Sequence, residues 1–419
     1  MRVSFRIGAA LIAALTISAC SAGSSSSNVP GTSASQGVFT SAKHAPPEWL
    51  VKHQARPDCP QVVGKPSCFA LRVLDVPAMC NPSSSCGFTA QQIEEAYGLT
   101  KKLNKGTNTV VALIENGDYS AAASDVATYR TEYGLGTANI QRYNSSGQQS
   151  NYPNSCEDFG WCVETALDFD MVSATCPKCT IYVMEADGSI SDMEKAEATA
   201  VTLGAKILSN SWGCYGDSTC GDPNFANYFN TKGIAYLAAS GDGGYGEIGG
   251  PAILSSVIAV GGTQLEASGN KFTESAWNGA SAGCGSASVV GTAVAKPSWQ
   301  SDPGCSYRTA ADISAEAGCS PGVAMYSGLY GGWFYECGTS AASPLVAGVV
   351  ALAGNASKLN AGQSIWQMSA KQMKKRLHPV KTGNDGSCGG SYLCTAGTGQ
   401  FGAYSGPTGW GTPKTIKAL

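Results

Sequence analysis

Short apolar runs alternate with helical patterns through the middle of the chain. The runs have the length of strands buried on both faces, and they cover residues 109–114, 180–184, 206–211, 234–239 and 256–260. Apolar residues at helical spacing predict helices over residues 89–98, 120–133, 163–174, 191–203, 224–232, 343–352 and 364–377. Strands that alternate with helices predict an α/β fold, doubly wound around a mostly parallel sheet. The Gly- and Ser-rich residues 264–336 predict loops and short antiparallel strands.

One serine stands at the entrance of a predicted helix. Ser340 lies among small residues just before the helix at 343–352, and Pro344 suits the first turn of that helix. Unpaired N–H groups at a helix start would stabilise a developing oxyanion, and Gly338 and Ala341 leave room for a substrate backbone. Ser340 is therefore a candidate nucleophile. The commoner role of such a serine is to cap a core helix, so partners elsewhere must decide between the two.

Composition and charge narrow the class of protein. The chain of 419 residues is 43% hydrophobic and 14% charged, which indicates a globular protein with ample material for a core. Its formal net charge of −3 gives no sign of a nucleic-acid partner, and we expect none. The 17 cysteines indicate an oxidising compartment.

The N-terminus predicts export. Arg2 and Arg6 precede an apolar run at residues 7–17 that is too short to span a bilayer, which is typical of a signal peptide. Residues 17–20 resemble a bacterial lipobox with Cys20 as the acylated residue, and an ordinary cleavage site is the alternative. Setting Cys20 aside leaves 16 cysteines, an even number that can all pair. We expect an extracellular or cell-envelope protein, attached to the membrane if Cys20 is lipidated.

The sequence predicts four parts along the chain. A signal peptide at 1–20 is followed by a flexible Ser- and Gly-rich tether at 21–43, a small disulfide-stapled segment at 44–88 and a large domain at 89–419. Proximity along the chain predicts the bridges Cys59–Cys68, Cys80–Cys86, Cys156–Cys162, Cys176–Cys179, Cys214–Cys220, Cys284–Cys305, Cys319–Cys337 and Cys388–Cys394. The Cys176–Cys179 spacing also suits a redox pair, but the pair follows a predicted helix instead of opening one, so we expect a structural bridge.

Histidine is the usual base that activates a catalytic serine. The chain has three, and His44 and His53 belong to the tether and the stapled segment. His378 follows the helix after Ser340. Because no histidine lies on the α/β core before Ser340, a Ser-His-Asp site is disfavoured, and a fold-back of His378 stays open as an alternative.

Carboxylates are the next candidates for the chemistry. Glu164 and Asp168 are four residues apart in the predicted helix at 163–174 and share one face. Held close, such a pair keeps a proton and raises one pKa, which suits a general base and its orienting partner in acid. The alternative is two solvated carboxylates on an exposed face. Asp242 follows the strand at 234–239, where a protonated carboxyl could donate to an oxyanion; the alternative is a turn aspartate that bonds its own backbone.

Taken in order, these motifs resemble the sedolisins, the serine-carboxyl peptidases related to subtilisins. The matching stretches lie at 111–119, 164–168, 209–213, 239–242, 259–263 and 338–341. The resemblance covers about residues 89–413 and implies a subtilisin-like fold in three layers. It also implies that Ser340 attacks the scissile carbonyl, that Glu164 takes its proton and that Asp168 orients Glu164.

Supporting roles follow from the same resemblance. Asp242 would hold the oxyanion together with the N–H of Ser340. Glu115, in the matching stretch at 111–119, would support the acidic pair from behind. Trp212 and Gly213 would pair with the substrate backbone.

The chain departs from the family pattern in three ways. The large propeptide domain of the family does not fit before residue 89, and the short stapled segment stands there instead. Pro379 and Ser405 occupy the places of two aspartates of the family's calcium site, and neither supplies an anionic oxygen, so we expect neither a metal nor a cofactor. The Cys388–Cys394 bridge would brace that loop instead. Cysteines are also more numerous than is usual in the family, and Cys337 replaces a small residue beside the serine.

The sequence therefore predicts a secreted serine-carboxyl endopeptidase that acts on proteins or peptides in acid, as a monomer. One alternative is a catalytically weak surface protein with a peptidase fold that binds peptides, because the propeptide is missing and the calcium loop is altered. A subtilisin-type mechanism that uses His378 is the other.

Overall fold

The computed structural model describes residues 55–62, 64–73, 80–83, 86–214, 224–286, 293–398 and 402–419. All of these residues lie in one compact unit, Phe39–Leu419. The predicted signal peptide with Cys20, the predicted tether, His44 and His53 lie outside the described residues. In the described part of the chain, no helix is both long and apolar enough to cross a bilayer.

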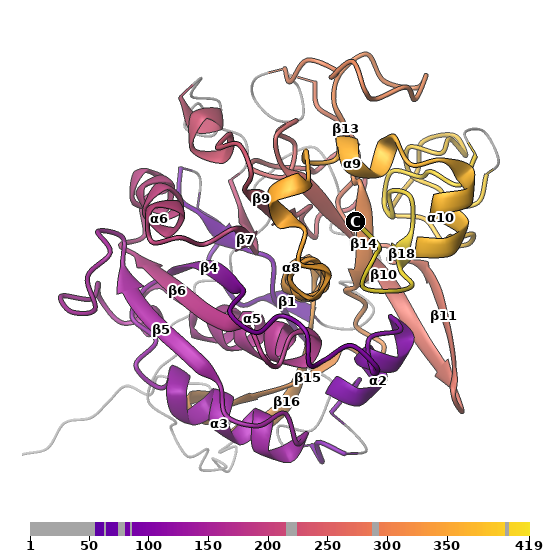
Figure 1. Cartoon of the computed structure of the whole chain (residues 1–419). Coiled ribbons are helices and arrows are strands. Elements are labelled where there is room, and N and C mark those ends of the chain that lie inside the picture. The colour runs from indigo at the N-terminus through magenta and orange to yellow at the C-terminus, as the bar shows by residue number, and fades with distance from the viewer. Residues whose placement is uncertain are drawn as a thin grey trace, which may run out of the picture. The chain divides into compact units, whose positions relative to one another are not determined.

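Eight strands of the described chain form one central sheet (Figure 1). Its order is β11-β10-β9-β7-β4-β6-β5, and β14 also pairs with β10. The strands are β4 (Val110–Asn116), β5 (Asn139–Asn144), β6 (Thr180–Ala186), β7 (Ile207–Asn210), β9 (Ala235–Ala239), β10 (Ile258–Ser268), β11 (Lys271–Ala276) and β14 (Ile313–Glu316). Every pair runs parallel except β10 with β11, which confirms the predicted α/β fold with a mostly parallel sheet.

Two buried helices carry most of the candidate site. α5 (Cys162–Thr175) and α8 (Thr339–Ala353) pack against each other and against the sheet. α6 (Ile190–Thr202) lies on the other side of β4 and β6 (Figure 1). α2 (Ala90–Ala96) and α3 (Ala122–Glu132) pack against α5. The shorter helices are α4 (Cys156–Phe159), α9 (Gln363–Trp366), α10 (Ala370–Arg376) and the 3-10 helices η1 (Phe225–Phe229), η2 (Gly328–Tyr330) and η3 (Ala356–Lys358).

The described part of the stapled segment adds strands to the main body. β1 (Ala55–Pro57) and β3 (Leu71–Val73) join β15 (Val323–Ser327) and β16 (Gly332–Cys337) in a four-stranded antiparallel sheet. β2 (Ser67–Cys68) pairs with β8 (Trp212–Gly213), directly after β7. Two further pairs are β12 (Gly283–Cys284) with β13 (Thr309–Ala310), and β17 (Leu377–His378) with β18 (Thr412–Pro413). The residues before the large domain are therefore woven into it by backbone pairing.

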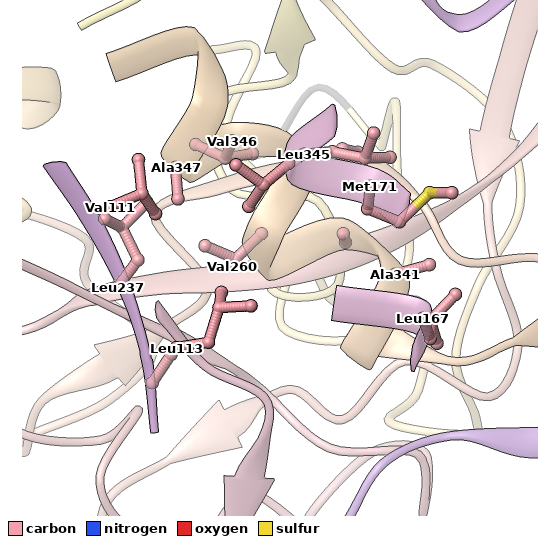
Figure 2. Close-up of a cluster of buried hydrophobic side chains, with 14 of the residues drawn as sticks. Val111, Leu113, Leu167, Met171, Leu237, Val260, Ala341, Leu345, Val346 and Ala347 are labelled. Carbon is pink, nitrogen blue, oxygen red and sulfur yellow. The ribbon is translucent and has the colours of Figure 1, made fainter. Parts of the chain in front are cut away.

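The helix α8 is packed on all sides by the core. Figure 2 shows apolar side chains of α8 packed among those of α5 and the central strands: Ala341, Leu345, Val346, Ala347, Leu167, Met171, Val111, Leu113, Leu237 and Val260. Every residue of α8 except the last is buried, as expected for a helix that is apolar on all sides. At Gly348 a Cβ would come within 1.9 Å of Thr175 Oγ1, so α5 and α8 can approach closely only because this residue is a glycine.

We expect Gly348→Ala to lower the free energy of unfolding by about 1–3 kcal/mol, as overpacking does in a filled core. Alanine normally stabilises a helix relative to glycine, so a loss is diagnostic of the close contact. Urea denaturation measures the change. Adding Thr175→Ala removes the nearest atom and should recover part of the loss. A Gly348→Ala chain as stable as the unchanged protein would contradict this packing.

Most predicted helices and strands are present, and the main differences concern two helices and two strands of the central sheet. The predicted helix at 224–232 is the short 3-10 helix η1. The predicted helix at 364–377 is two helices, α9 and α10, because Ser369 and Gln372 form a capping box that starts a new helix. β5 was not predicted because it is a largely polar strand at the sheet edge, and β14 was not predicted because it lies in the Gly- and Ser-rich region.

Seven of the eight predicted disulfides are present in the described chain: Cys59–Cys68, Cys80–Cys86, Cys156–Cys162, Cys176–Cys179, Cys284–Cys305, Cys319–Cys337 and Cys388–Cys394. The eighth, Cys214–Cys220, includes a residue outside the described part. Both sulfurs of Cys176–Cys179 belong to buried residues of the core, in line with a structural bridge.

Candidate active site

Ser340 is the second residue of α8. Pro344 lies inside the helix and not in its first turn, because α8 begins earlier than the sequence predicts, at Thr339. A residue at 344 would normally donate its N–H to the carbonyl of Ser340, and proline has no N–H. The Ser211 hydroxyl lies 3.3 Å from that carbonyl instead. The proline thus leaves the carbonyl oxygen of Ser340 available to the Ser211 hydroxyl.

The hydroxyl of Ser340 contacts a carboxylate. Its Oγ donates to Glu164 Oε2 at 2.8 Å and lies 3.1 Å from the carbonyl oxygen of Ser211. Ser340, Glu164 and Asp168 are fully buried, so the interpretation of the acidic pair as solvated carboxylates is wrong. His378 is half-buried in β17, where it pairs with Thr412 of β18. Its pKa is lowered by burial and by Lys414, and no described hydrogen bond joins it to Ser340.

Three carboxyl groups form a hydrogen-bonded cluster behind Ser340. Glu164 and Asp168 project from α5 and Glu115 from β4, and Asp168 is hydrogen-bonded to both glutamates. The Ser211 hydroxyl donates to Asp168 Oδ1 at 2.7 Å, and the Thr165 hydroxyl lies 3.2 Å from Glu115 Oε2. Two carboxyl oxygens can share a hydrogen bond only through a proton, so the cluster retains protons.

Burial is the main cause of the raised pKa values of the three carboxyl groups in this cluster. It raises the pKa of Asp168 to about 7, against hydrogen bonds from Ser211 and the glutamates that lower it. Burial and the negative charge of Asp168 raise the pKa values of Glu164 and Glu115 well above the usual range. Desolvation penalises the charged form of each acid, and their mutual repulsion penalises it further. The cluster therefore holds at least one shared proton in acid and near neutrality.

Asp242 lies at the entrance of α8, just beyond the end of β9. Its Oδ1 accepts hydrogen bonds from the N–H and the hydroxyl of Thr339, both at 2.8 Å. These partners lie on α8, so the interpretation of Asp242 as a turn residue that bonds its own backbone is wrong. Burial raises its pKa to about 8. Below that pH the carboxyl is protonated, and its Oδ2, which has no described partner, can donate a hydrogen bond.

Residues of the stapled segment complete the site. The N–H of Phe69 lies 3.1 Å from Ser340 Oγ and 3.2 Å from the carbonyl oxygen of Ser211. The N–H of Ala70 donates to Glu164 Oε2 at 3.0 Å. The predicted substrate-pairing residues Trp212 and Gly213 form β8, which is paired with β2 of the same segment.

The sequence missed several of these partners. Ser211 and Thr339 stand within motifs that were recognised, at 209–213 and 338–341, so their neighbours gave a signal. Phe69 and Ala70 gave none, because they are 271 and 94 residues from the side chains they contact.

No plausible metal site is evident in the described part of the chain. The one group of potential ligands that comes together there is Cys59, Cys68 and Glu164, and the two cysteines are joined in a disulfide, so neither offers a thiolate. Ser405 is one of the two residues in the place of the family's calcium-binding aspartates, and its hydroxyl lies 2.7 Å from the hydroxyl of Thr408. The predicted Cys388–Cys394 bridge near this loop is present. The absence of a calcium ion and of a cofactor stays a prediction.

Comparison with known proteins gives a peptidase family and a solved structural relative. A model of the subtilase family matches residues 136–389. No curated protein matches the sequence. Pseudomonas sedolisin, a serine-carboxyl proteinase solved with two molecules of pseudo-iodotyrostatin, is 25% identical, with a TM-score of 0.65 over 79% of this chain and 96% of that one. A lanthipeptide protease is 14% identical, with a TM-score of 0.48 over 78% of this chain and 94% of that one. Sphericase is 18% identical, with a TM-score of 0.48 over 79% of this chain and 99% of that one.

Proposed function

The chain belongs to the subtilase family, and within it we propose an acid-active endopeptidase of the serine-carboxyl type. The family and the sedolisin neighbour support a serine-type peptidase. The observation that carries the finer proposal is the 2.8 Å contact between Ser340 Oγ and Glu164 Oε2. A carboxylate stands there in the place of the imidazole of a Ser-His-Asp site.

The proposed reaction is acyl transfer followed by hydrolysis. Ser340 Oγ attacks the scissile carbonyl and passes its proton to Glu164 Oε2. Asp168 shares a hydrogen bond with Glu164 and so sets the orientation and basicity of that carboxyl, with Glu115 supporting Asp168. The protonated Asp242 donates to the oxyanion. Glu164 then gives its proton to the leaving nitrogen, and water releases the acyl group from Ser340 by the same steps.

We also propose a class of substrate and a location for the protein. Proteins or peptides are the substrates, with Trp212 and Gly213 pairing with their backbone. The protein is exported as a secreted protein or a lipoprotein anchored through Cys20, and it acts as a monomer without metal, cofactor or nucleic acid. The oxidising environment that its disulfides need supports export.

We expect peptidase activity to be greatest in acid and to fall as pH rises through about 7. Burial raises the pKa of Asp168 to about 7 and that of Asp242 to about 8. Below these values the acidic cluster shares its proton and Asp242 can donate to the oxyanion. Above them both protons are lost, and a negative Asp242 repels the developing charge. Digestion of casein from about pH 3 to about pH 9 measures the profile.

The control for that profile is the Ser340→Ala chain. An optimum above about pH 8, or activity that survives Ser340→Ala, would contradict the proposal. Binding of peptides without cleavage at any pH would instead support the alternative of a peptide-binding surface protein.

A further inference from the structure

Exposed lysines line the amino ends of the central parallel strands. The strands β9, β7, β4 and β6 are neighbours in that order and run parallel. An exposed lysine stands within five residues before each of them, namely Lys232, Lys206, Lys105 and Lys178. Because parallel strands begin at the same edge of a sheet, about 5 Å apart, these lysines form a row across that edge.

Two close backbone approaches extend this row into a face. The turn of Lys232 adjoins the segment of Lys358, since a Cβ on Gly233 would lie 3.8 Å from the carbonyl oxygen at position 357. The segment that leads to the lysine before β4 adjoins Lys414, since a Cβ on Gly98 would lie 2.5 Å from the carbonyl oxygen of Lys414. We call the exposed side chains of the following residues the basic face: Lys105, Lys178, Lys206, Lys232, Lys358 and Lys414.

The basic face carries a local excess of positive charge. None of its lysines forms an ion pair or a side-chain hydrogen bond within the described part of the chain. The segments that carry them contain no Asp or Glu: 98–110, 175–180, 203–206, 230–234, 354–358 and 414–419. The whole chain has 30 acidic and 27 basic side chains, so an even mixture would have placed acids among these lysines. A surface that only needs to be soluble mixes both signs.

Helix dipoles do not account for these lysines. A cation stabilises the C-terminal end of a helix, but the effect falls off within the last turn. Lys178, Lys206 and Lys358 stand three to five residues beyond the ends of α5, α6 and α8. Their common feature is the edge of the molecule at which they lie.

The basic face lies at the opposite end of α8 from Ser340. Ser340 is in the first turn of this helix, whereas Lys358 follows its last residue, Ala353. The 15 residues of α8 span about 22 Å. On β9 the arrangement is the same, because Lys232 precedes the strand and Asp242 follows it. A surface that binds the basic face therefore leaves the candidate active site on the far side.

We propose that the basic face binds a membrane surface that carries anionic lipid headgroups. The inference rests on the proposed export of the protein to the cell envelope. Residues 21–54 join the predicted acylation site, Cys20, to the start of β1 at Ala55. A flexible chain of that length has an end-to-end distance of about 30 Å. It would hold the domain near the membrane at high effective concentration, where a modest attraction is enough to orient it.

The chemistry of lysine suits this partner. Each ammonium group is a point charge on a flexible stem, so it can meet phosphate groups that have no fixed arrangement. A bilayer with anionic lipids offers many such phosphates in one plane, and each lysine near it strengthens binding about five-fold. The domain would then lie with its basic face on the lipid and its active site toward substrates in solution.

The test is sedimentation of the exported chain with lipid vesicles, with Cys20→Ser to remove the acylation site. We expect binding to phosphatidylcholine vesicles that contain about one third phosphatidylglycerol, and none to phosphatidylcholine alone. Raising the salt from about 0.05 M to about 0.5 M should release the chain, because the Debye length falls. Equal binding to both vesicles, or binding that salt does not weaken, would overturn the proposal.

Two pairs of substitutions locate the binding surface. Lys206→Gln with Lys232→Gln should lower the partition coefficient about 25-fold, at about five-fold for each lysine. Lys65→Gln with Lys271→Gln is the matched control, because both residues are exposed and the net charge changes equally. Lys65 precedes β2 and Lys271 begins β11, on the side of the carboxyl strand ends. Equal losses in the two pairs would mean that net charge drives binding, and the face would be wrongly assigned.

Peptide cleavage on the vesicles tests the orientation. Bound enzyme should cut a fluorogenic peptide at the rate of the free enzyme, because the active site faces away from the lipid. A several-fold loss of activity on binding would contradict this orientation. Capture by soluble polyphosphate without binding to vesicles would mean that the face recognises an anionic polymer, and the membrane proposal would be wrong.

Failure of this inference can be told from failure of the proposed function. Ser340→Ala should bind the vesicles as well as the unchanged chain, because binding needs no catalysis. Binding without cleavage of any peptide supports the basic face and contradicts the peptidase, and cleavage without binding does the reverse. Fractionation of cells that make the unchanged chain tests export separately, and a chain found only in the cytoplasm would contradict it.

Discussion

Glu164→Gln is expected to lower kcat/KM on casein-derived peptides by at least about 10⁴-fold, the scale on which loss of one member of a catalytic unit acts. The amide has the shape of the carboxyl and keeps an oxygen that can accept from Ser340, but it cannot hold the transferred proton. Stability should change little by comparison. Steady-state kinetics with a fluorogenic peptide in acid measures the effect.

Two control variants make that result specific. Asp170 is a buried carboxyl on the same helix, and its Oδ2 accepts from the N–H of Tyr326, away from Ser340. Asp170→Asn should keep activity within a few-fold. His378→Ala should also keep it, and a loss there would revive the subtilisin-type alternative. A Glu164→Gln chain with more than a tenth of the original activity would contradict its role as the base.

Two substitutions of Asp242 should separate the effect of its charge from the effect of its hydrogen bond to the oxyanion. Asp242→Ala removes the donor to the oxyanion and should cost about 10²–10³-fold in kcat, as loss of one such donor does. Asp242→Asn keeps an acceptor for Thr339 and an N–H donor that does not titrate. It should retain most of the activity and lose the decline that the titration of Asp242 near pH 8 causes. The pH profiles of kcat for the three chains give the comparison.

Two results would contradict the role of Asp242 as the donor to the oxyanion. If Asp242→Asn is as inactive as Asp242→Ala, the proton on this carboxyl does more than hold the oxyanion. If Asp242→Ala is fully active, Asp242 is a structural residue whose function is to hold Thr339 at the entrance of α8.

Local sequence patterns were sufficient to predict the candidate nucleophile and its acids. The four-residue spacing of Glu164 and Asp168 puts both on one face of α5, and the small residues around Ser340 allow α8 to begin beside them. Burial of the two acids was not predictable from that spacing, because it depends on α8 and residues 67–71 covering that face. Five of the described bridges join cysteines three to nine residues apart, and such short loops made these pairings predictable.

Long-range contacts are where the sequence was least informative. Nothing in the local pattern joins Phe69 to Ser340 or Ala70 to Glu164, because a paired backbone N–H leaves no side-chain signature. Proline is common in the first turn of a helix, which predicts that position for Pro344, yet α8 starts at Thr339. β5 carries too few apolar residues to show as a buried strand, since it lies at the edge of the sheet.

Activation of the Ser340 hydroxyl by Glu164 is tested most directly by kcat/KM of the Ser340→Ala/Glu164→Gln chain beside the two single variants. Residues that act as one unit do not add, so the double variant should be no slower than the slower single variant, within about three-fold. Losses that multiply in the double variant would mean that the serine and the carboxyl act independently.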